Sequence, residues 1–248
     1  MKPVRMLLAA ALLFFLVCAG RAFAHGGLVD LSIYDRTEAR RLPVYWHEGR
    51  AYVVGRPGNE YQITLRSRRS GEELLAVVSV DGVNVITGQT ADYSQSGYVV
   101  GSRSGMDIQG WRRNLGQTAA FYFTSLPDSY AARTGRPDNV GVIGLAVFRR
   151  KQVPPPAPIG RLESHSDSAP AARSMPAEPQ LGTGHGRHET SPARYVSFER
   201  ATSSPAEVIT LYYDSRANLV ARGVIREPVP VAPYPRPTPF PGFVPDPA

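Results

Sequence analysis

Apolar and polar residues alternate with a period of two between residues 28 and 150, which is the pattern of strands with one buried and one exposed face. Ile63 and Leu65, for example, fall on one face, and the residues beside them are polar. Residues 74–81 repeat this alternation, and Asp81 with the glycine after it supplies the positive φ angles of a tight turn. The sequence therefore predicts a β-hairpin at this turn.

Similar short patterns recur along the same part of the chain. Residues 140–148 are apolar on both faces, which predicts a central strand, whereas residues 129–135 favour a short helical turn. Further strands are predicted at residues 28–34, 42–46, 51–54, 97–100, 106–112 and 119–124. Many short strands separated by turn residues indicate an all-β fold, an antiparallel β-sandwich or barrel-like domain, over residues 25–151.

The composition changes after this domain. Residues 152–190 are rich in Pro, Ala, Ser and Gly, and we predict a disordered linker there. Residues 191–227 are predicted to form a small unit of three antiparallel strands, at 195–198, 208–213 and 219–225, that docks on the first domain. Residues 228–248 hold too many prolines for a helix or a central strand, so an extended Pro-rich tail is expected.

The first 24 residues have the organisation of a secretory signal peptide. Lys2 and Arg5 precede an apolar run that is too short to span a bilayer, and Ala22 and Ala24 are the small residues that a signal peptidase accepts. The mature chain is therefore expected to begin at His25, in the periplasm or outside the cell, without a transmembrane anchor. Cleavage also removes the single cysteine, so the fold cannot depend on a disulfide.

The charge of the mature chain is mild. The signal peptide carries three basic residues and no acidic one, so its removal lowers the formal net charge from +7 to +4. The arginines are scattered in pairs rather than gathered in one stripe, which argues against nucleic acid as a partner.

Five short segments follow one another in order along the chain, VDG at 80–82, GY at 97–98, GWR at 110–112, GTGHG at 182–186 and YDS at 213–215. In this combination the chain resembles a group of secreted proteobacterial β proteins that has no assigned activity. The resemblance covers most of the mature chain. It implies an envelope or secreted β protein and assigns a role to no residue.

Two segments resemble motifs of known enzymes, but each lacks a required residue at the required position. The segment 101–105 has the glycines of a nucleophile elbow, but Arg103 stands where the serine is required. His188 and the following glutamate begin like a zincin helix, but Pro192 occupies the position of the second histidine. His185, His188 and Glu189 could hold a metal ion only at the cost of ordering the predicted linker.

We therefore expect a non-enzymatic exported protein that acts by binding or as a structural part of the cell envelope, with a protein or polysaccharide as partner and no cofactor. Exposed aromatic rings on a sandwich can stack on sugars, although packing in the core is their commoner use. The residues that could form a ligand site at one rim are Asp81, Asn84, Tyr98, Trp111 and Arg112.

One alternative is a mononuclear copper protein, either a redox enzyme or a carrier. Cleavage after Ala24 would give His25 a free amine beside its imidazole, and a second imidazole would complete the T-shaped copper site of lytic polysaccharide monooxygenases, whose first residues resemble His25-Gly26. His47 is the other histidine of the first domain and the candidate second ligand. The commoner explanation is that His25 merely follows the cleavage site.

Overall fold

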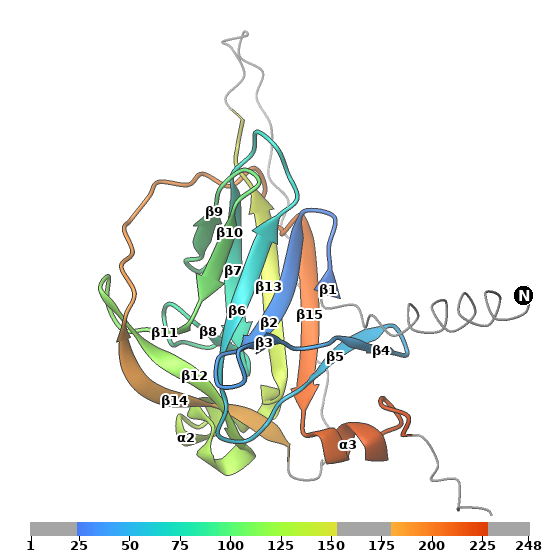
Figure 1. Cartoon of the computed structure of the whole chain (residues 1–248). Coiled ribbons are helices and arrows are strands. Elements are labelled where there is room, and N and C mark those ends of the chain that lie inside the picture. Colours follow the sequence, from blue (N-terminus) through green and yellow to red (C-terminus); the bar gives the residue numbers. More distant parts are fainter. Residues whose placement is uncertain (1–23, 153–179, 228–248) are drawn as a thin grey trace, which may run out of the picture.

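The computed structural model describes residues 24–152 and 180–227, and these form two β-sheets packed face to face (Figure 1). This confirms the predicted all-β sandwich. The predicted signal peptide, most of the predicted linker and the Pro-rich tail lie outside the described residues.

Sheet A has eight strands, with β1, β2, β6, β12 and β11 in spatial order. β10 also pairs with β6, β14 with β12 and β3 with β2, and all these pairs are antiparallel. Its strands are β1 (Ala24–His25), β2 (Val29–Asp35), β3 (Arg40–Arg41), β6 (Glu60–Ser67), β10 (Gly105–Ile108), β11 (Gly110–Arg112), β12 (Gln117–Ser125) and β14 (Leu181–Thr190).

Sheet B has seven strands in the order β4, β5, β15, β13, β7 and β8, and β9 pairs with β7. The pair β15 and β5 is parallel, and the others are antiparallel. Its strands are β4 (Tyr45–His47), β5 (Arg50–Val54), β7 (Leu74–Val80), β8 (Val83–Asn84), β9 (Tyr98–Val100), β13 (Val142–Arg149) and β15 (Glu207–Asp214). Short helices connect the strands: η1 (Leu126–Asp128), α2 (Tyr130–Arg133), η2 (Pro137–Asn139) and α3 (Arg216–Ala221).

The alternation found in the sequence places the core between the sheets. Ile63 and Leu65 of β6 are fully buried and belong to one cluster with Val78 of β7 and Leu145 of β13. The predicted hairpin is confirmed, because β7 pairs with β8 and Asp81 adopts a φ of 52° at the turn. The predicted central strand is β13, which lies between β15 and β7.

Several predicted boundaries need adjustment, and the strand expected at 42–46 is β4, which begins only at Tyr45. The strand expected at 106–112 is two strands, because β10 pairs with β6 and β11 pairs with β12. The helical turn expected at 129–135 is α2, and the Ser129 side chain caps it by accepting from the Ala132 amide.

The prediction of a disordered linker over 152–190 is wrong at its C-terminal end. Residues 181–190 form β14, which pairs with β12 along its whole length. The glycines there serve close packing: a Cβ at Gly182 would lie 2.5 Å from the Ser129 Cβ, and one at Gly184 would overlap the Tyr122 ring. Glycine is required at such close approaches, so a linker-like composition here belongs to a strand.

The prediction of a small three-stranded β unit over 191–227 that docks on the first domain is also wrong. Its middle strand is β15, which lies inside sheet B between β13 and β5 rather than on an edge. Residues 195–198 form no strand, and residues 216–221 form helix α3. The side chain of Ser215, which precedes this helix, caps it by accepting from the Asn218 amide. Residues from both ends of the described chain therefore share one sandwich.

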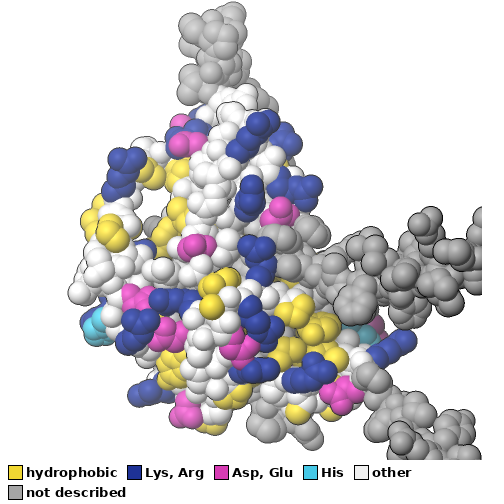
Figure 2. Space-filling model, viewed as in Figure 1, with side chains coloured by type: hydrophobic (Ala, Val, Ile, Leu, Met, Phe, Trp, Pro, Cys, Tyr) yellow, Lys and Arg dark blue, Asp and Glu magenta, His cyan; other side chains and the backbone are white. Residues whose placement is uncertain are grey.

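The surface agrees with the mild charge of the chain. On the face shown in Figure 2, Lys and Arg side chains are spread among Asp and Glu side chains and form no single basic stripe. Within residues 24–152 and 180–227, no helix has the length and apolar character needed to cross a bilayer.

Candidate functional site

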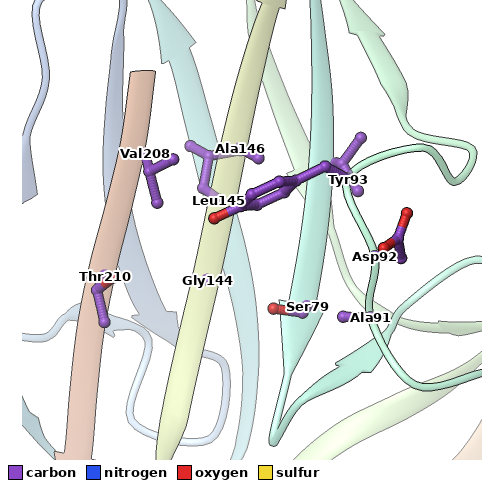
Figure 3. A pocket seen from close by; sticks show the side chains of 10 residues that line it. Ser79, Ala91, Asp92, Tyr93, Gly144, Leu145, Ala146, Val208 and Thr210 are labelled. Atoms are coloured by element: carbon purple, nitrogen blue, oxygen red, sulfur yellow. The ribbon is translucent and has the colours of Figure 1, made fainter. Parts of the chain in front are cut away.

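An open groove of about 320 Å³ lies on the outer face of sheet B, over β7, β13 and β15 (Figure 3). The strand register builds its floor as two rows, because Gly144 lies opposite both Ser79 and Thr210, and Ala146 lies opposite both Val77 and Val208. The volume falls within the range of natural ligand sites. The lining residues are Val77, Ser79, Ala91, Asp92, Tyr93, Gly144, Leu145, Ala146, Val208 and Thr210.

The groove exists because the side chains that point outward from these three strands are small where they form its floor. Outward positions on β13 run from Phe148 through Ala146 to Gly144, and a Cβ at Gly144 would lie 2.7 Å from the Ser79 hydroxyl oxygen. On β15 the groove ends at Tyr212, whose ring centroid lies 5.4 Å from that of Tyr52. Any larger residue at position 144 would fill the middle of the floor.

A loop between β8 and β9 forms one wall. Its Tyr93 side chain is 52% exposed and reaches over β13 in Figure 3. Arg200 fixes this loop, because its guanidinium donates to the carbonyl oxygens of Tyr93, Ser94 and Gln95 and lies 4.3 Å from the centre of the Phe148 ring. The wall is therefore attached to sheet B.

The polar groups of the groove are suited to hydroxylated ligands. Ser79 and Thr210 place hydroxyl groups on the floor, and Asp92 stands at the wall. The side-chain hydrogen bond from Ser94 lowers the pKa of Asp92, so this carboxylate is ionised at neutral pH and can accept hydrogen bonds. The lining residues therefore offer two hydroxyl groups, a carboxylate and an aromatic ring to a ligand.

Asp81, predicted as a ligand residue, lies in the core instead. It is 1% exposed and accepts hydrogen bonds from the amides of Gly141 at 2.9 Å and Thr183 at 2.8 Å, and from the Tyr213 hydroxyl. The Thr183 hydroxyl in turn lies 2.7 Å from both the Tyr213 and the Tyr61 hydroxyl oxygens. Burial raises the pKa of Asp81 to about 6, and these hydrogen bonds limit the rise. The network joins the two sheets.

Asn84 and Trp111 are also structural. Asn84 is fully buried, accepts from the amides of Ile86 and Thr87, and donates to the Ser96 carbonyl, so it shapes the loop after β8. Trp111 is 4% exposed and donates its indole N–H to the Gly184 carbonyl at 3.1 Å.

Tyr98 and Arg112 are the two predicted ligand residues that meet directly. The Arg112 Nε donates to the Tyr98 hydroxyl at 3.3 Å, and its guanidinium also donates to the Ser191 carbonyl and, at 3.2 Å, to the Ser191 hydroxyl. Arg112 therefore fastens the segment after β14 to sheet B. The five predicted residues do not form one rim.

The described residues contain no group of metal-ligating side chains that would support the copper alternative. Among the described residues, no three His, Cys, Asp or Glu side chains are grouped closely enough to hold a metal ion, and the His25 side chain itself is not described. His47 lies 3.7 Å from the Glu48 carboxylate. Ala24 of β1 is buried and pairs with Leu31 of β2, so cleavage after Ala24 would remove this pair from the mature chain.

Sequence reasoning missed the groove. The signal that could have indicated it is the run of small residues at the outward positions of three apolar strands, namely Ser79, Gly144 with Ala146, and Thr210. These positions become neighbours only through the register of β7, β13 and β15.

The fold and this groove define the chain as an all-β sandwich with an open site on one outer sheet face. Comparisons with protein-family models, with curated proteins and with solved structures found no match to the chain.

Proposed function

We propose that the protein is exported, stays in the periplasm or outside the cell, and binds a polysaccharide of the cell envelope in the groove of sheet B without acting as an enzyme. The export proposal rests on the signal peptide pattern of residues 1–24. The resemblance to secreted proteobacterial β proteins agrees with it.

The observation that carries the proposal is the combination of groups in the groove. A half-exposed tyrosine ring and an ionised carboxylate at the wall stand beside a floor with one row that carries two hydroxyl groups and one row that is apolar. A sugar ring has an apolar C–H face that can lie on an aromatic ring and a rim of hydroxyl groups that need hydrogen-bond partners.

The proposal is tested by sedimentation of the mature protein with purified peptidoglycan sacculi and by titration with soluble envelope polysaccharides. Tyr93→Ala removes the ring and Thr210→Trp fills the exposed end of the floor, so each should reduce binding at least about tenfold. Tyr195→Ala is the matched control, because Tyr195 is 89% exposed and lies outside the groove. Equal binding by all four forms would contradict the proposal.

A further inference from the structure

A β-bulge brings two histidines of β14 to one face of sheet A. His188 lies opposite Ala119 and His185 lies opposite Phe121, so two residues of β14 face Ala120 alone. Residues three apart on a regular strand point to opposite faces, but the extra residue of a bulge restores them to the same one. The ring centroids of His185 and His188 are 6.2 Å apart.

An arginine from the neighbouring strand completes this group. Trp111 of β11 also lies opposite Ala119, and Arg113, two residues further on, points to the same face. The Arg113 side chain reaches across β12, and its guanidinium lies against the imidazole of His188. We call Arg113, His185 and His188 the basic cluster.

The surroundings of the basic cluster are cationic. Burial lowers the pKa of His185, and Arg113, His188 and Arg133 of α2 lower it further by repulsion. From α2, Tyr130 stacks on His185 with ring centroids 5.6 Å apart. From η1, the Asp128 carboxylate accepts from the Ser125 hydroxyl.

Glu189 does not serve this group, although the sequence suggested it as a possible metal ligand with the two histidines. It lies opposite Thr118, on the other face of β14, where Arg36 donates to both of its carboxylate oxygens at 2.8 Å. Arg187, which also contacts Glu189, is paired with Glu60 on that face. A cation at the basic cluster would therefore meet two imidazoles and a guanidinium with no carboxylate among them.

We propose that Arg113, His185 and His188 bind a tetrahedral oxyanion, a phosphate or sulfate group. The guanidinium supplies fixed charge and directed N–H donors, and each imidazole offers one N–H donor when neutral and two with a positive charge when protonated. The anion would lie between Arg113 and His188 and accept hydrogen bonds from both side chains, in place of their direct contact. This site is separate from the groove, and its existence does not depend on the proposed function.

The test follows the imidazole and guanidinium signals of the mature protein by NMR while sulfate is added at pH 7.5 and at pH 5.5. Sulfate keeps its charge over this range, so tighter binding at pH 5.5 reports protonation of the histidines. Saturable shifts of His185 and His188 are expected. Arg113→Gln should weaken binding about tenfold or more, because a charged hydrogen-bond donor is lost.

Arg103→Gln is the control for the loss of one positive charge, because Arg103 lies in a different loop, and it should bind as the unaltered protein does. Inorganic phosphate and a sugar phosphate are titrated separately. Tighter binding of the sugar phosphate identifies a phosphorylated polymer as the source, and tighter binding of inorganic phosphate identifies the free ion. Either result supports the site.

Two results would overturn the proposal. One is sulfate binding that is equal in the Arg113→Gln and Arg103→Gln variants, or absent from the unaltered protein. The other is tighter binding of Zn²⁺ than of sulfate through both imidazoles, strengthened by Arg113→Gln, which would show a metal site obstructed by the arginine.

Discussion

The Tyr213 hydroxyl of β15 donates a hydrogen bond to the buried carboxylate of Asp81 at the end of β7. Burial raises the pKa of Asp81 to about 6 from 3.8, so the folded protein retains a proton that the unfolded chain has already lost at pH 5. Stability from this group is therefore greatest below about pH 4 and falls as the pH rises to about 6, by about 3 kcal/mol.

Asp81→Asn should remove this dependence. Asparagine also tolerates the φ of 52° at this position, so the turn is retained. The quantity to follow is the difference in the free energy of unfolding, unaltered protein minus variant. We expect this difference to decrease by about 3 kcal/mol between pH 4 and pH 7. Urea unfolding at several pH values measures it. A difference that stays constant with pH would show that Asp81 titrates normally.

The second prediction concerns the carboxylate of Glu207, which accepts hydrogen bonds from the amides of Gly27, Leu28 and Val29 and so ties the start of sheet A to β15. A Cβ at Gly26 would overlap this carboxylate, whereas one at Gly27 would lie 3.8 Å from it. Gly26→Ala should therefore lower the free energy of unfolding by about 2 kcal/mol, because part-buried amides lose their acceptor.

Gly27→Ala is the matched control for this prediction and should change stability by less than about 0.5 kcal/mol. Thermal and urea unfolding of both variants measure the two changes in stability. Equal stability of the two variants would mean that Glu207 does not hold this segment.

The third prediction tests whether the chain is one sandwich. Without residues 180–227, β5 and β13 lose β15, the strand they share, and β12 loses β14. Two co-expressed fragments, 25–152 and 180–248, should therefore assemble into a one-to-one complex with a cooperative unfolding transition, which native mass spectrometry and circular dichroism detect. Cooperative folding of fragment 25–152 alone would support the two-unit organisation that composition predicted.

The fourth prediction addresses copper. A copper site at His25 needs the free amine, so one extra residue before His25 would abolish tight binding. We expect weak Cu(II) uptake that the extra residue leaves unchanged, because among the described side chains no group of three possible ligands includes His47. Calorimetric titration of both forms measures this. Tight one-to-one binding by the form that begins at His25, and by that form alone, would establish the copper alternative.

Much of the fold could be predicted from the local pattern of apolar and polar residues. The hairpin at Asp81 was predictable because its turn residues and flanking alternation lie within a few positions of each other. Strand β14 was not, because its glycines are explained only by Tyr122, Ser129 and other side chains that pack on it. Composition alone cannot separate a glycine required by close packing from one in a linker.

Less of the candidate site than of the fold could be predicted from the sequence. Asp81 was recognised as a turn residue, but its burial depends on Thr183 and Tyr213, which lie about 100 or more positions further along the chain. The groove depends likewise on the register that places Gly144 between Ser79 and Thr210. Such neighbours are set by the pairing of distant strands, which no local pattern contains.

The most direct test of polysaccharide binding in the groove is an amide shift map of the mature protein, recorded by NMR with the envelope polysaccharide that it retains. The largest shifts are expected at Ser79, Tyr93, Gly144 and Thr210, and Tyr93→Ala is expected to remove them. Shifts confined to other surfaces, or shifts at these residues that persist in Tyr93→Ala, would contradict polysaccharide binding in the groove.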